Sequence, residues 1–155
     1  LREFEERVVK QYADTLKQSK RPLHQIVTMA SLVEEETRKG EERPVVASIL
    51  WKRFDAGMGL GVDATVRYVL QKPTGKLTVA DLNGNSPYNL RKFRGLPPGP
   101  IASPGIESIR ATLVPKATPY WYYLHGADGQ VHYAETNEEH NVNKYKYLSG
   151  GGGEG

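Results

Sequence analysis

Three consecutive glutamates, Glu34 to Glu36, have the residue type and the position to carry acid–base chemistry. They end a segment whose apolar residues recur at helical spacing: Leu23, Ile26, Val27, Ala30 and Val33. A helix turns by about 100° per residue, which places Glu34 inside the apolar arc, one turn after Ala30. Glu35 and Glu36 point away from the centre of that arc. The spacing therefore predicts that Glu34 alone is aimed at the apolar side.

A carboxylate on an apolar face is costly unless it is paired, protonated or open to a cleft. Burial favours the protonated form of a carboxyl group, and that form is a usable general acid. Periodicity leaves two interpretations of Glu34 open: it transfers protons in a reaction, or it lies at the edge of the stripe and pairs with an Arg or Lys. For Glu35 and Glu36, we expect a solvated face.

A long segment from Asn83 to Gly105 is rich in Pro, Gly and Asn. Such a composition excludes regular helix and central strand. A long irregular loop in a compact domain is often functional. We expect the part around Tyr88 and Asn89 to form the wall of a cleft, and the alternative is a structural turn.

The four histidines do not form a metal-binding pattern. His125 and His132 could face each other across a hairpin, but no third ligand accompanies them, and His24 and His140 stand alone. Cysteine is absent, which excludes disulfides and cysteine–zinc sites. We predict neither a metal nor a cofactor.

The chemistry-bearing residues must be positioned by a mostly helical scaffold, because apolar periodicity and capping residues indicate helices along most of the chain. The expected helices lie before Pro22 and over about 23–39 (closed by Gly40), 44–54, 64–70 (capped by Asp63), 104–113 and 136–148. Thr78 and Asp81 have the spacing of a capping box, which marks the start of a helix. Residues 120–125 and 130–134 predict a β-hairpin. The predicted class is α+β, with a helical first third, an irregular Pro/Gly-rich middle, a small antiparallel sheet and a C-terminal helix.

The 155 residues fit one domain, which we place at residues 1–149, with a flexible glycine-rich tail at 150–155. With 38% hydrophobic and 25% charged residues, the chain has the composition of a globular protein. Its net charge of +3 is too small and too scattered to indicate nucleic acid. Because the chain begins with Leu1, we expect it to be a piece of a longer protein.

Several blocks of this sequence, in the same order, resemble the MltG/YceG-like endolytic transglycosylases over roughly Ile26 to Asn141. The blocks are 30–37 (ASLVEEET), 42–49 (ERPVVASI), 53–54 (RF), 57–58 (GM), 63–66 (DATV), 86–89 (SPYN), 95–101 (GLPPGPI), 103–105 (SPG) and 140–141 (HN). The resemblance implies an enzyme that cleaves nascent peptidoglycan strands between N-acetylmuramic acid and N-acetylglucosamine.

The resemblance also implies roles for individual residues. The family's catalytic glutamate is the first of its helix motif, which is Glu34 here, and Glu36 matches a recurrent family acid with an orienting role. Asp63, Thr65, Tyr88 and Asn89 keep the residue type of family positions, and we expect them to bind the substrate. Asp63 would stabilise a charged sugar ring or hold a sugar hydroxyl, and its alternative is a helix cap.

The resemblance further implies a location and partners. The family acts on the extracytoplasmic face of the bacterial membrane, held there by an anchor that we expect outside this chain. Its substrate is the glycan strand, and cell-wall synthases are candidate partners.

The chain departs from the family pattern at a few positions. The family usually has Gln where this chain has Gly61, Pro where it has Ala64, Asn where it has Lys52 and Thr where it has Leu90. We expect the departures at Gly61 and Leu90 to affect substrate fit. Two other functions stay open: a muramidase-type hydrolase on the same scaffold, and a wall-binding module without catalysis.

Overall fold

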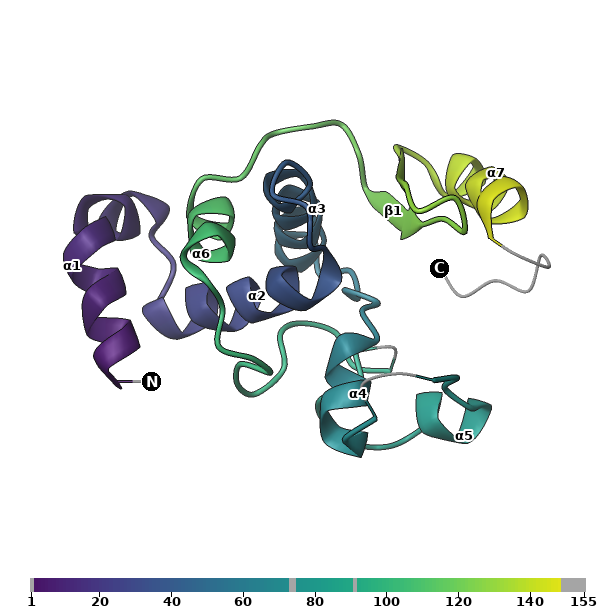
Figure 1. Ribbon diagram of the computed structural model, residues 1–155, viewed down its shortest axis with the longest axis horizontal. Coiled ribbons are helices and arrows are strands. Elements are labelled where there is room, and N and C mark those ends of the chain that lie inside the picture. Colours follow the sequence, from purple (N-terminus) through teal and green to yellow (C-terminus); the bar gives the residue numbers. More distant parts are fainter. Residues whose placement is uncertain (1, 73–74, 91, 149–155) are drawn as a thin grey trace. The chain divides into compact units, whose positions relative to one another are not determined.

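The computed structural model describes residues 2–72, 75–90 and 92–148, so the predicted tail at 150–155 lies outside the described residues. The elements confirm the predicted α+β class (Figure 1). The chain divides into two compact units, Leu1–Lys116 and Ala117–Gly155. A single catalytic domain over 1–149 stays a prediction, and each unit is described by itself.

The core of the first unit is built by three helices that pack on one another: α2 (Leu23–Glu36), α3 (Arg43–Asp55) and α6 (Ile106–Leu113). Every residue of α2 from Ile26 to Val33 is buried, so this middle part of the helix is enclosed on all sides, whereas its ends reach the surface. α3 begins with Pro44 in its first turn, where the missing N–H costs no hydrogen bond. The Trp51 indole joins α3 to α6 by donating to the Thr112 carbonyl at 3.0 Å.

The first helix, α1 (Arg2–Ser19), ends before Pro22 as predicted and packs on α6. It is not continuous, because Tyr12 has a non-helical backbone (φ −121°, ψ 25°).

The C-terminal end of α2 differs from the prediction. The helix stops at Glu36, three residues short of the expected end, and Thr37 is extended (φ −151°, ψ 142°). The Thr37 side chain is buried, and its hydroxyl donates to the Glu42 carboxylate. This bond holds Thr37 in the connection to α3, so Gly40 does not cap the helix.

Two short helices follow α3, and both begin where the sequence predicted. They are α4 (Ala64–Leu70), which contacts α2, and α5 (Val79–Leu82). Thr78 and Asp81 form a reciprocal capping box at the start of α5. The Pro-rich segment that follows is tied to α2, because the Ile101 N–H donates to the Ser31 hydroxyl at 3.1 Å.

The second unit is a hairpin with one helix: β1 (Tyr122–His125), β2 (Val131–Ala134) and α7 (Asn137–Tyr147). Leu124 lies opposite His132 in the antiparallel register, and His125 lies opposite Val131. The expectation that His125 and His132 face each other is therefore wrong, because this register places their side chains on opposite faces of the hairpin. His132 instead contacts Asp128 in the turn at 2.9 Å.

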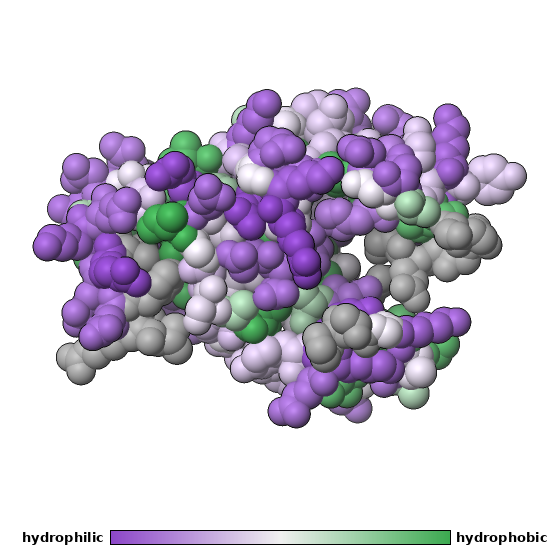
Figure 2. All heavy atoms as spheres, in the orientation of Figure 1, coloured by the Kyte–Doolittle hydropathy of each residue, from purple (hydrophilic) through white to green (hydrophobic). Residues whose placement is uncertain are grey.

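The face drawn in Figure 2 is mostly hydrophilic, with small, separate hydrophobic areas between its charged residues. None of the helices over residues 2–72, 75–90 and 92–148 has the length and apolar character needed to cross a membrane. The described residues visible on this face therefore form no broad apolar surface.

Candidate functional site

Glu34 lies in the last turn of α2 and is fixed by the start of α6. Its Oε1 accepts a hydrogen bond from the Gly105 N–H at 2.8 Å and another from the Ser108 hydroxyl at 2.9 Å. Its side chain keeps 29% of its surface exposed, and Glu35 is exposed. The helix-face prediction is confirmed in this respect: of these two neighbours, Glu34 turns toward the packed side.

Arg43, at the start of α3, is shared between two carboxylates. Its Nη2 is 3.7 Å from Glu34 Oε2, and its Nη1 donates to Glu107 Oε2 at 2.9 Å. The Arg43 side chain is only 13% exposed, whereas that of Glu107 is 68% exposed. The pairing with an arginine that was left open for Glu34 is thus present. Oε2 accepts no hydrogen bond from the described residues, since 3.7 Å exceeds hydrogen-bond distance.

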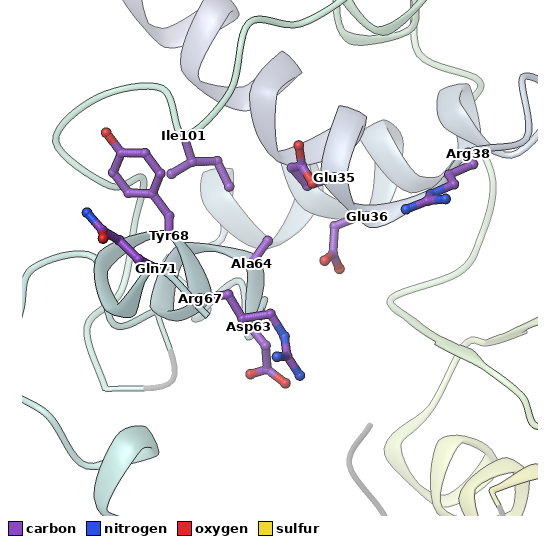
Figure 3. A pocket seen from close by; sticks show the side chains of 9 residues that line it. All are labelled: Glu35, Glu36, Arg38, Asp63, Ala64, Arg67, Tyr68, Gln71 and Ile101. Carbon is purple, nitrogen blue, oxygen red and sulfur yellow. The ribbon is translucent and has the colours of Figure 1, made fainter. Parts of the chain in front are cut away.

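A pocket of about 540 Å³ lies between the C-terminal end of α2 and α4 (Figure 3). Its lining residues combine charged groups and one amide with one aromatic and two aliphatic side chains: Glu35, Glu36, Arg38, Asp63, Ala64, Arg67, Tyr68, Gln71 and Ile101. Glu34 is not among them. The Glu34 side chain therefore points toward the start of α6. The Glu36 side chain lies on another side of the same helix end, in the lining of the pocket.

Asp63 and Glu36 are the two predicted site residues that the pocket brings together. Asp63 occupies the N-cap position of α4, but its side chain makes no capping hydrogen bond. The alternative interpretation of Asp63 as a side-chain cap is therefore wrong, and its carboxylate belongs to the pocket.

The other three predicted binding residues lie outside the lining of this pocket. Thr65 is buried in α4, and its hydroxyl is 3.5 Å from the Val62 carbonyl. Asn89 is also buried, and its amide donates to the Leu82 and Gly84 carbonyls at 2.9 and 2.8 Å. In this conformation, the Thr65 side chain contacts the backbone at the start of α4, and the Asn89 side chain holds the backbone that follows α5.

Tyr88 is only partly buried, and its ring lies 5.5 Å from that of Tyr68, tilted by 38°. Tyr88 therefore does not line the pocket itself but contacts Tyr68, which does.

Sequence reasoning missed Arg67 and Gln71 as lining residues. Both follow Asp63 at intervals of four residues, so that Arg67 lies within α4 between its two cap residues, Asp63 and Gln71. This spacing is the signal that would have found them. Arg38 gave no signal, because it lies beyond the end of α2.

Two departures from the family pattern have structural explanations. Gly61 has a positive φ of 68°, which favours glycine, and the guanidinium of Arg53 lies 3.5 Å from where a Cβ would stand. Leu90 is buried in the core, so its effect on a substrate can only be indirect. Within the described part of the chain, no three His, Cys, Asp or Glu side chains are grouped as metal ligands.

Comparison with known proteins places this geometry in a family. The YceG-like family matches residues 1–146. The chain is 40% identical over 141 residues to the endolytic murein transglycosylase of Bacillus subtilis, which covers 91% of the chain and 39% of that protein. It is 30% identical over 144 residues to the Streptococcus pneumoniae protein of the same name, covering 89% of the chain and 26% of that protein.

A solved structure agrees with these relatives. A yceG-like protein from Listeria monocytogenes superimposes with a TM-score of 0.81 at 38% identity, covering 86% of this chain and 44% of that one. The chain spans well under half the length of the curated relatives that it matches. The match over nearly all of its residues shows that the chain belongs to the YceG-like family.

Proposed function

We propose that this chain is the catalytic part of a lytic transglycosylase, which cleaves the bond between N-acetylmuramic acid and N-acetylglucosamine in murein strands. Relatives that match about nine-tenths of the chain carry the name endolytic murein transglycosylase. The observation that carries the proposal is the state of Glu34: two donors fix Oε1, while Oε2 accepts no hydrogen bond from the described residues.

One carboxyl group suffices for the reaction proposed. Protonated Glu34 gives its proton to the glycosidic oxygen as the bond from that oxygen to muramyl C1 breaks, and positive charge builds on the ring. The resulting carboxylate then takes the proton of the muramyl 6-hydroxyl, whose oxygen bonds to C1 and closes a 1,6-anhydro ring. Glu34 ends protonated, as it began, and no water is consumed. This differs from the usual glycosidase, which uses two carboxyl groups.

The surroundings of Glu34 suit this double use. A proton-transfer group must be held in the orientation of the reaction, and the bonds from Gly105 and Ser108 fix the carboxyl plane. Arg43 Nη2 lies 3.7 Å from Oε2, so a positive charge stands beside the carboxylate that forms once Glu34 has given up its proton. Arg43 also pairs with Glu107, so its charge is shared between two carboxylates.

Glu36 is the second candidate for the same role, because it lines the pocket with Asp63 and Glu34 does not. A pocket with convergent polar groups is the usual place for a bound ligand. If Glu36 were the acid, Asp63 would be the carboxylate best placed to stabilise the charged ring. We otherwise assign Glu36 and Asp63 to substrate binding, with Tyr88 behind Tyr68 and with Thr65 and Asn89 supporting the site.

We also propose that the chain acts on the extracytoplasmic face of the bacterial membrane, where murein is built. An anchor in the full protein and cell-wall synthases as partners belong to the same proposal. Such an anchor would raise the local concentration of strands without adding any contact in the site.

The test is digestion of purified murein strands by the parent and by Glu34→Gln, Glu36→Gln and Glu41→Gln, with products identified by mass spectrometry. Gln keeps the shape of Glu and removes the acid, so Glu34→Gln should lower turnover by at least ~10²-fold, the lower end for a general acid. Glu41→Gln, at an exposed glutamate that does not line the pocket, is the matched control and should change little. Full activity of Glu34→Gln beside an inactive Glu36→Gln would move the role to Glu36.

The products decide between the remaining functions. Products that end in 1,6-anhydro-muramic acid support the transglycosylase, whereas reducing ends, one water heavier, would make the chain a muramidase. A folded parent that binds strands and cuts none would leave a wall-binding module.

A further inference from the structure

The pocket between α2 and α4 has a composition that suits an amphipathic ligand. Tyr68 and Ile101 supply apolar surface, and Gln71 and the charged residues supply hydrogen-bonding groups. Small-molecule sites combine an apolar wall with a few polar groups that orient the ligand. A pyranose ring fits this description, because it has an apolar face and a rim of hydroxyl and acetamido groups.

Tyr68 is the side chain best placed to receive such a ring. It is 49% exposed although it lines the pocket. Its ring is supported by that of Tyr88, 5.5 Å away between centroids. Tyr offers a rigid aromatic face at little cost in side-chain entropy, which is why such residues recur at binding surfaces.

Arg38 is the cation of the pocket that has no partner within the described residues. It is exposed, and no carboxylate of residues 2–72, 75–90 or 92–148 forms an ion pair with it. Arg67, the other cation, donates to the Lys72 carbonyl at 3.3 Å. A guanidinium recognises a carboxylate through two parallel hydrogen bonds. Arg38 is thus available to a carboxylate on a ligand.

We propose that this pocket is a subsite for a muramyl-peptide unit of the strand, with the sugar ring stacked on Tyr68 and a carboxylate of the peptide stem paired with Arg38. The inference rests on the proposed function for its substrate class, murein. The new element is that the pocket recognises the peptide stem as well as the sugar.

The acidic side chains of the pocket sharpen this inference. Glu35, Glu36 and Asp63 outnumber the two arginines, so a free small anion gains little there. The same carboxylates accept hydrogen bonds from hydroxyl and acetamido N–H groups. The carboxylate is therefore bound only when the sugar brings it to Arg38, and inorganic phosphate should not occupy the pocket.

The test is a titration of the chain, followed by backbone NMR shifts, with three probes. They are muramyl dipeptide, which has one carboxylate; the same molecule with that group amidated; and inorganic phosphate. We expect muramyl dipeptide to shift the amides around the pocket, with affinity roughly twofold to fivefold above that of the amidated form, the scale of one exposed charge pair. We expect no shifts at this pocket with phosphate.

Two variants and their controls locate the contacts. Arg38→Gln should remove the preference for the charged probe and leave the affinity for the amidated probe unchanged. Tyr68→Ala should weaken both probes about tenfold. Arg110→Gln, an exposed arginine on α6, and Tyr145→Ala, an 84% exposed tyrosine on α7, are the matched controls and should bind like the parent.

The subsite would be refuted if Arg38→Gln and Tyr68→Ala both bound the two dipeptide probes with the affinity of the parent. It would also be refuted if the parent bound neither form of the dipeptide. These outcomes are separate from those of the proposed function, because they are read without catalysis. Strand cleavage with unchanged binding in both variants would leave the proposed function standing and the subsite refuted. Binding as expected, without strand cleavage by the parent, would support the subsite and refute the proposed function.

Discussion

Gly105→Ala is the sharpest perturbation of Glu34 that the structure allows. Gly105 is extended (φ −73°, ψ 168°), a conformation open to alanine. Its N–H donates to Glu34 Oε1, and an added Cβ would stand 3.3 Å from that same oxygen. The carboxylate must then give way by a few tenths of an ångström. The N–H remains, so only the position of Glu34 is changed.

The expected loss of turnover follows from this displacement. A misplacement of about 1 Å can cost roughly 10²-fold in rate, so a shift of a few tenths should lower kcat by about threefold to fivefold. Replacing glycine by alanine in an allowed conformation stabilises by ~0.4–1 kcal/mol, which the close contact offsets. The melting temperature should therefore stay within about 3 °C of that of the parent.

The assay is the initial rate of product release from purified strands, with thermal melting of the same samples. Gly40→Ala is the control, because its nearest atom would be Glu107 Oε2 at an ordinary 3.8 Å. A folded Gly105→Ala variant with the kcat of the parent would refute the reasoning and direct the search for the acid to Glu36.

Three further predictions concern stability. Trp51→Phe leaves the Thr112 carbonyl without its donor and should cost about 1–3 kcal/mol in urea unfolding; an unchanged midpoint would contradict this. Thr136→Ala removes the cap of α7 and should lower stability there by about 1 kcal/mol, measured by amide exchange; unchanged exchange along α7 would contradict this. The Thr78 N–H holds the pKa of Asp81 below its usual 3.8. Its stabilisation of α5 is present above that value and lost as the pH falls through the lowered pKa. Faster exchange of the Thr78 amide in acid, absent in Asp81→Asn, would show this.

The helix starts that the sequence predicted correctly are those set by local chemistry. The capping box of Thr78 and Asp81 and the cap at Thr136 act on residues within one turn, so their spacing contains the information. The predicted C-terminal end of α2 was wrong because a contact outside the helix determines where the helix stops. Thr37 is buried and bonded to Glu42 from the next segment, and nothing in the helical pattern predicts that.

In the candidate site, too, the sequence predicted what depends on one helix and missed what depends on packing between elements. The direction of Glu34 followed from periodicity, since it is a property of one helix. Its donors, Gly105 and Ser108, lie 71 and 74 residues away in sequence, and Arg43 comes from another helix. Such partners are set by packing, so no spacing rule could name them. The pocket was missed for the same reason: it needs α2 and α4 to lie side by side.

The two environments at the end of α2 follow from helix geometry and predict different kinetics. Two residues apart on a helix is about 200°, so Glu34 and Glu36 must face nearly opposite sides. A single sugar cannot touch both, but a strand of sugars that passes the helix end can. If Glu34 cuts and the pocket holds a neighbouring unit, Gly105→Ala should lower kcat, whereas Arg38→Gln should raise KM and leave kcat unchanged. If Glu36 cuts, the pattern reverses: Gly105→Ala is silent, and Arg38→Gln lowers kcat because the pocket then holds the reacting ring. Steady-state rates of these two variants on one strand preparation therefore identify which side of α2 does the chemistry.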